Sequence, residues 1–230
     1  MSRILFVVTG ADRLTLADGT THPTGFWAEE AVAPYEAFRA AGHEVVVATP
    51  GGVVPPVDRG SLTPEMNGGQ ENADRIAAAL RSFTELQRPV PLEDVRLDEY
   101  AAVFYPGGHG PMEDLAVNPD SGRLLTGALE SGKPLAVVCH GPAALLAAVR
   151  DDGTNAFAGY EVAAFTNAEE TQGGLAGKVK WLLQDRLTEA GVRVRTGEPW
   201  APNVVTDRNL VTGQNPASSA PLAEELLKLL

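Results

Sequence analysis

The chain has 230 residues, of which 44% are hydrophobic, 21% are charged and one is a cysteine. This length suits one α/β domain with a large core, and a single cysteine excludes an internal disulfide. The formal net charge of −12 disfavours binding to nucleic acid or to anionic membrane surfaces, and no apolar run is long enough to span a bilayer.

The N-terminal half predicts strands that alternate with helices. The apolar run at 3–10 predicts a first strand and is too short for a signal peptide, so we expect a cytoplasmic protein. A loop excursion rich in glycine and proline is expected at about 49–70, within one domain that covers 1–230. Apolar spacing predicts helices over 26–41 and 72–86, and strands over 43–49 and 100–105.

The C-terminal half continues the alternation. The pattern predicts helices over 121–130, 175–190 and 217–230, and strands ending at Cys139 and over 160–165, 192–194, 203–206 and 210–212. Such an order is typical of the α/β class, with a mostly parallel sheet and helices on both faces. Active sites of these sheets lie beyond the carboxyl ends of the strands. We therefore expect four loops to meet at one rim, at 9–30, 106–112, 139–141 and 166–174.

Cys139 is the first candidate catalytic residue. It follows the apolar run Leu135-Ala-Val-Val138 and precedes Gly141 and Pro142, which allow a tight turn into a helix. Backbone amides at a helix start stabilise a thiolate, the nucleophilic form of cysteine. The alternative is that Cys139 is a small buried apolar residue with no chemical role.

Three further residues are candidates around this thiol. The amides of Gly108 and His140 are expected to form an oxyanion site, although a plain tight turn would also explain the glycines. His140 is expected to orient or deprotonate the thiol, or else to pack at a helix start. Glu170 is placed to be its carboxylate partner; Glu169 is equally well placed, and the spacing leaves the choice open.

Glu30 opens the first predicted helix together with Glu29. Glu29 lies one heptad from Glu36 on a solvated face, whereas Glu30 aligns with Phe38 on the core side. Burial would raise the pKa of Glu30 and make it a proton donor beside the thiolate. A favourable interaction with the helix dipole is the alternative for both residues.

No metal site is expected. The four histidines, His22, His43, His109 and His140, show no metal-ligand spacing, and only one cysteine is available.

Five segments together resemble the ThiJ/PfpI superfamily, whose members are similar to class I glutamine amidotransferases. The resemblance is to its glutathione-independent glyoxalase III and stress-chaperone branch. The segments are Thr24-Gly-Phe-Trp-Ala-Glu-Glu-Ala-Val-Ala-Pro34, Tyr105-Pro-Gly-Gly-His-Gly110, Ala136-Val-Val-Cys-His-Gly-Pro142, Phe165-Thr-Asn-Ala-Glu-Glu170 and Val211-Thr-Gly-Gln-Asn-Pro-Ala217.

The resemblance implies a flavodoxin-like fold, a homodimer, and a site in which Cys139 is the nucleophile. His140 and Glu170 would complete a triad, and Glu30 would contact the thiol. The implied reaction is of the D-lactate dehydratase type, in which methylglyoxal, a small dicarbonyl, becomes lactate through a cysteine hemithioacetal without metal, nucleotide or glutathione. Alternatives are a stress-related holding chaperone or protein deglycase, and a cysteine amidase or peptidase of the same superfamily.

Overall fold

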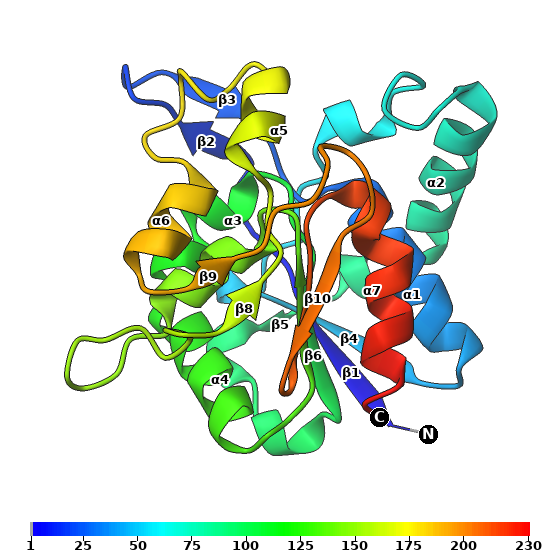
Figure 1. Ribbon diagram of the computed structural model, residues 1–230. Helices are drawn as coiled ribbons and strands as arrows, with labels where there is room; N and C mark the ends of the chain where they lie inside the picture. The colour runs from blue at the N-terminus through cyan, green and yellow to red at the C-terminus, as the bar shows by residue number, and fades with distance from the viewer. Residues whose placement is uncertain (1) are drawn as a thin grey trace.

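A central seven-stranded sheet organises the computed structural model, which describes residues 2–230. The strand order is β10-β11-β7-β6-β1-β4-β5; only the β10–β11 pair is antiparallel (Figure 1). These strands are β1 (Arg3–Val7), β4 (Glu44–Thr49), β5 (Val90–Pro91), β6 (Ala102–Tyr105), β7 (Leu135–Val138), β10 (Val204–Asp207) and β11 (Leu210–Gly213). Two small sheets pair β2 (Arg13–Thr15) with β3 (Thr21–Pro23) and β8 (Glu161–Val162) with β9 (Arg193–Val194).

Helices cover both faces of the large sheet, as the sequence predicts. Figure 1 shows α1, α2 and α7 on one side and α3, α4 and α6 on the other. The α-helices are α1 (Ala28–Ala40), α2 (Gln70–Ser82), α3 (Gly110–Glu113), α4 (Pro119–Glu130), α5 (Asn167–Gln172), α6 (Leu183–Glu189) and α7 (Ser219–Leu227). The expected α/β class with a mostly parallel sheet is therefore confirmed.

The core forms around the central strands because their side chains are apolar on both faces, as parallel strands buried between helix layers require. Phe6 of β1 lies 4.7 Å from Phe104 of β6 between ring centroids and meets Phe38 of α1 edge to face. All three rings are fully buried. This packing holds α1, and with it Glu30, against the carboxyl ends of the strands.

Three expected elements differ from the structure. The helix predicted over 175–190 is wrong in its first half: Val179 instead pairs with Leu16 across the β2–β3 hairpin, and the helix begins at Leu183. Gly174 and Gly177 interrupt the helical pattern there. The predicted loop at 166–174 is largely α5, and the strand predicted over 160–165 shortens to β8.

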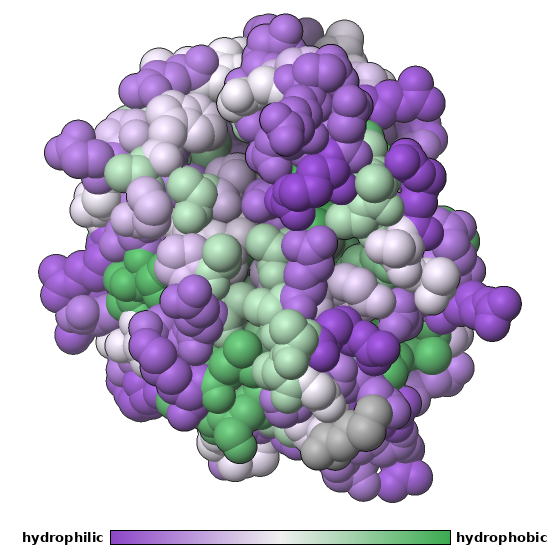
Figure 2. Space-filling model, turned by 90° about the vertical axis from the view of Figure 1, so that its right-hand side faces the viewer, coloured by the Kyte–Doolittle hydropathy of each residue, from purple (hydrophilic) through white to green (hydrophobic). Residues whose placement is uncertain are grey.

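The surface agrees with the acidic, polar composition. Figure 2 shows the side that carries α1, α2 and α7, where hydrophilic side chains surround a strip of less polar ones. Across residues 2–230, no helix is both long enough and apolar enough to cross a membrane.

Candidate active site

Four segments distant in the sequence enclose one cavity at the carboxyl ends of β6 and β7. Its volume is about 530 Å³. All four loops that the sequence places at this rim contribute lining residues: Trp27 from the first, His109 from the second, Cys139 from the third and Glu170 from the fourth. The four predicted loops therefore meet at one rim, as the strand-end rule leads us to expect.

Cys139 occupies a strained turn directly after β7. Its φ angle is 59°, in the left-handed region that residues other than glycine seldom adopt. The chain then enters a helix, as expected, which is the 3-10 helix η7 (Gly141–Ala147). Because the backbone reverses at Cys139, its side chain and that of the next residue converge, and Sγ lies 3.4 Å from Nδ1 of His140.

The glycines of the loop after β6 allow the backbone to approach the thiol. A Cβ atom on Gly107 would lie 2.7 Å from Oε2 of Glu30 and 2.7 Å from the backbone nitrogen of His140. Gly108 has a φ of +85°, and a Cβ there would lie 2.2 Å from the carbonyl oxygen of Gly25. The amides of Gly108 and His140 both lower the pKa of the Cys139 thiol, so the two expected oxyanion donors lie near the sulfur.

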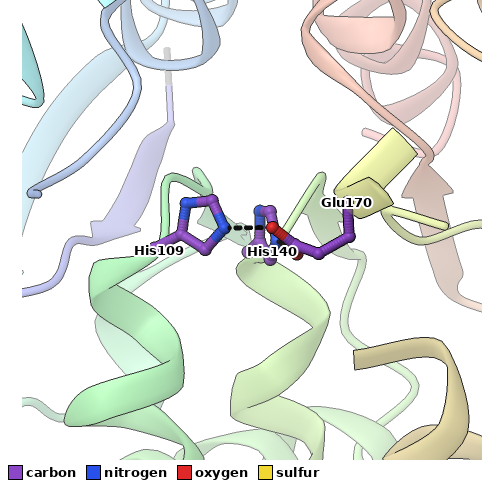
Figure 3. Close-up of side chains that lie close together, drawn as sticks. All are labelled: His109, His140 and Glu170. Carbon is purple, nitrogen blue, oxygen red and sulfur yellow. Dashed lines mark hydrogen bonds and ion pairs between the residues drawn. The ribbon is translucent and has the colours of Figure 1, made fainter. Parts of the chain in front are cut away.

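Glu170 links two histidines (Figure 3). Its Oε2 lies 2.7 Å from Nε2 of His140, and its Oε1 lies 2.7 Å from Nε2 of His109. The two imidazoles lower the pKa of Glu170 well below its usual range, although burial opposes them. A carboxylate only accepts hydrogen bonds, so both histidines donate from Nε2. The Nδ1 atom of His140 is thereby left as an acceptor facing the thiol.

His140 is suited to accept the thiol proton. It is almost fully buried, and burial lowers its pKa; the nearby His109 lowers it further, while Glu170 raises it. The imidazole is therefore neutral at pH 7, as a general base must be.

The structure separates Glu169 from Glu170, which the sequence leaves open. Both lie on α5, which is capped by Thr166. Glu169 turns away from the thiol: it accepts hydrogen bonds from the Trp200 amide, from the side chains of Gln214 and Asn215, and from Thr166. Glu169 therefore anchors the loop before β10, and Glu170 is the residue that faces the site.

His109 is a site residue that the sequence considers only as a metal ligand. It precedes α3, and its ring lies 4.0 Å from that of His140 between centroids. Its position in a glycine-rich turn after a strand was the available signal, because that turn belongs to the predicted rim.

Glu30 is fully buried beside the thiol. Its Oε2 accepts a 2.7 Å hydrogen bond from the Gly107 amide, and its carboxyl group faces Cys139. Among the described residues 2–230, Oε1 of Glu30 is buried without a hydrogen-bond partner, an arrangement that disfavours the charged form. Burial accordingly raises the pKa of Glu30 from 4.5 to about 8, so this carboxyl group carries a proton at neutral pH.

The structure provides only part of the environment that was expected to stabilise the thiolate form of Cys139. Burial raises the pKa of Cys139, and an ionised Glu30 raises it further, whereas the amides of Gly108 and His140 lower it. Because Glu30 is protonated at neutral pH, its carboxyl group adds no negative charge beside the sulfur. The pKa of the Cys139 thiol is therefore raised well above its usual value, in contrast to the thiolate expected from the sequence.

The raised pKa of Glu30 predicts a pH-dependent stability. The folded state keeps a proton that the unfolded chain loses above about pH 4.5, so this stabilisation is complete at low pH and is lost as the pH rises through about 8. Between about pH 5 and pH 8, the unfolding free energy of the natural protein should fall relative to that of Glu30→Gln, by at most about 1.4 kcal/mol per pH unit. Urea titrations at several pH values measure this difference; parallel curves for the two proteins would contradict the assignment.

Three side chains with potential metal-ligating atoms converge in the site, although their spacing in the sequence does not indicate a metal site. Donor atoms of His109, His140 and Glu170 all lie within 4.8 Å of one another, which makes them the one such group among residues 2–230. These residues come together from three separate segments of the chain, so their sequence spacing does not match a metal-binding motif. The Nε2 atom of each of the two histidines is already hydrogen bonded to Glu170.

Comparison with known proteins identifies chains that are similar over nearly the whole of this chain. The protein/nucleic acid deglycase HchA of Staphylococcus aureus is 27% identical over 227 residues, covering 96% of this chain and 77% of the relative. The structure of glyoxalase III from Candida albicans has a TM-score of 0.81 and 25% identity, covering 100% of this chain and 97% of that one. The 24 kDa Rapid Encystment Protein of Francisella tularensis has a TM-score of 0.87 and 28% identity, covering 100% and 99%.

A family model described as the DJ-1/PfpI family matches residues 22–229. That range contains every candidate site residue from Glu30 to Glu170 and all five segments on which the resemblance rests. The chain therefore belongs to the DJ-1/PfpI family.

Proposed function

We propose that this protein is a glutathione-independent glyoxalase of the D-lactate dehydratase type, which converts methylglyoxal to lactate. The observation that carries the proposal is the placement of the strained Cys139 between a protonated Glu30 and a neutral His140, at the base of a cavity. The structural likeness to a chain described as glyoxalase III supports it.

The first step forms the carbon–sulfur bond. His140 accepts the thiol proton at Nδ1 while the sulfur adds to the aldehyde carbon of methylglyoxal. The amides of Gly108 and His140 lie beside that carbon and stabilise the developing oxyanion. Glu30 donates its proton to this oxygen, and the product is a hemithioacetal.

The second step moves hydrogen between the two substrate carbons. The Glu30 carboxylate left by the first step removes the hydrogen from the former aldehyde carbon and returns it to the neighbouring carbon, while His140 protonates the ketone oxygen. The hydroxyl proton of the hemithioacetal returns to the Glu30 carboxylate as the thioester carbonyl forms, which restores the protonated Glu30. The aldehyde carbon is thereby oxidised to a thioester and the ketone carbon is reduced to an alcohol, so no external oxidant is needed. Water then releases lactate and restores the thiol.

Chelation is expected to leave this activity unchanged. The steps above use only side chains and backbone amides, even though His109, His140 and Glu170 offer metal-binding atoms. Lactate should form from methylglyoxal without glutathione at the same rate before and after exhaustive EDTA treatment. Loss of the rate on treatment, with recovery on adding zinc or nickel, would show that a metal takes part.

A deglycase activity is the second candidate, favoured by the name of the Staphylococcus aureus relatives. Cys139 would then act on the adduct of methylglyoxal with an amine or guanidine. To separate the two activities, lactate release is measured from methylglyoxal-treated N-acetyllysine and from free methylglyoxal. The concentration of free methylglyoxal is kept equal in the two assays. Faster release from the adduct would favour the deglycase.

A further inference from the structure

The cavity above Cys139 is large for methylglyoxal. Its volume of about 530 Å³ falls within the range of roughly 300–1,000 Å³ that is typical of pockets for drug-sized ligands. A three-carbon substrate bound to the sulfur would leave most of this space unfilled. The residues that line the rest of the cavity therefore indicate which side group the substrate carries, which the catalytic groups alone do not.

Trp200 forms one of these walls in a strained conformation. Its φ angle is 64°, so its backbone adopts the left-handed conformation, which is unfavourable for tryptophan. Three contacts hold it there: its amide donates to Glu169 over 2.9 Å, its indole Nε1 donates to Gln172 over 2.5 Å, and its ring meets Phe165 edge to face at 5.5 Å. Despite these contacts the residue is 39% exposed, so its burial does not explain the strain.

The aromatic wall, defined here as Phe165 and Trp200, begins at the catalytic imidazole. The Phe165 ring lies 4.4 Å from that of His140 between centroids, at an interplanar angle of 35°. The backbone amide of Phe165 donates to the carbonyl of Cys139 over 2.9 Å, which fixes the wall to the turn that carries the nucleophile. A group attached to the reacting carbons would therefore extend along aromatic surface.

The rest of the cavity lining is also largely apolar beyond the reacting groups. The apolar residues Leu16, Trp27, Met66 and Leu175 contribute to it. The carboxyl group of Asp58, another lining residue, accepts hydrogen bonds from Thr24 and from the Gly60 amide instead of remaining free for a ligand. Lys178 is exposed at the mouth. This lining favours an uncharged, apolar side group.

We propose that the aromatic wall binds the side group of the substrate, and that the preferred substrates are α-oxoaldehydes with an aryl or bulky alkyl group, such as phenylglyoxal. The inference rests on the proposed function and names its substrate class. The chemistry is unchanged: the aldehyde carbon is oxidised, the adjacent ketone carbon is reduced, and water releases the 2-hydroxy acid, which is mandelate for phenylglyoxal.

The test compares kcat/KM for phenylglyoxal and methylglyoxal in the natural protein and in Trp200→Gly. Glycine adopts the left-handed conformation without strain and keeps the amide that donates to Glu169, so the fold should persist. Filling an apolar pocket contributes roughly tenfold or more to kcat/KM. The natural protein should favour phenylglyoxal by about tenfold or more, and Trp200→Gly should reduce the ratio of kcat/KM for phenylglyoxal to kcat/KM for methylglyoxal to about one.

Trp181→Ala is the matched control, because Trp181 lies outside this cavity and should leave the preference intact. Equal kcat/KM for the two aldehydes in the natural protein, or an equal loss for both in Trp200→Gly, would overturn the proposal.

Binding of the product acids separates this proposal from the proposed function. If neither aldehyde is converted, the proposed function is wrong, and calorimetric titration with mandelate and lactate still tests the wall. Tighter binding of mandelate, lost in Trp200→Gly, supports the aromatic wall as a binding surface; equal binding of the two acids overturns it.

Discussion

Replacing Glu30 with glutamine is expected to reduce kcat for methylglyoxal by about 100-fold to 10,000-fold, the usual contribution of a general acid or base. Glutamine preserves the size of the side chain, and its oxygen can still accept from the Gly107 amide, so the fold and the cavity should persist. It cannot donate and recover a proton, which both bond-forming steps require. Steady-state lactate formation measures the loss.

Glu29→Gln is the matched control for this substitution on the same helix turn. The Glu29 carboxyl lies 3.4 Å from Arg75 in a partly exposed ion pair, and such pairs contribute little to stability. Its turnover should stay close to that of the natural protein. Equal losses at the two positions, or none at Glu30, would show that the wrong face of α1 had been assigned to the chemistry.

Replacing Glu170 with glutamine is expected to reduce kcat by about 1,000-fold, because it changes which nitrogen of His140 carries the proton. The carboxylate accepts a hydrogen bond from Nε2–H of His140 and leaves Nδ1 free to accept from Cys139 at 3.4 Å. A glutamine amide can donate to Nε2 instead, which would put the proton on Nδ1 and block acceptance from the thiol. In serine proteases, an equivalent carboxylate-to-amide change costs a factor of this order or larger.

Glu189→Gln provides the comparison for Glu170→Gln, because Glu189 is exposed at the end of α6 and pairs with Arg186. Its rate should be unchanged. Thermal unfolding of both variants establishes that they are folded. A Glu170→Gln protein that is folded and retains more than a tenth of the natural rate would show that the Glu170–His140 pair does not set the protonation of the site.

The strands and the nucleophile position were predictable from the sequence because they depend on local pattern. Continuous apolar runs identify parallel strands buried on both faces, and the turn after β7 is marked by Cys139, Gly141 and Pro142. The burial of Glu30 was predictable for the same reason, since helical periodicity alone places it on the face that Phe38 shares.

The errors arise where tertiary contacts override local pattern. Val179, Leu183 and Leu187 are buried as the predicted helix over 175–190 requires, yet Val179 reaches the core from a loop that pairs with Leu16. The choice between Glu169 and Glu170 depends on Asn215, which is distant in the sequence. The role of His109 likewise depends on α5, which brings Glu170 to it.

The most direct test of the account is the lactate made from methylglyoxal, without glutathione, by the natural protein and by Cys139→Ser. The hydroxyl group of serine is far less acidic than a thiol and is a poor nucleophile without a stronger base. The account predicts that the natural protein releases lactate of a single handedness, because Glu30 delivers hydrogen from one side of the bound substrate, and that folded Cys139→Ser releases none above the buffer rate. Equal rates for the two proteins, or racemic lactate from the natural protein, would contradict a reaction on the sulfur of Cys139.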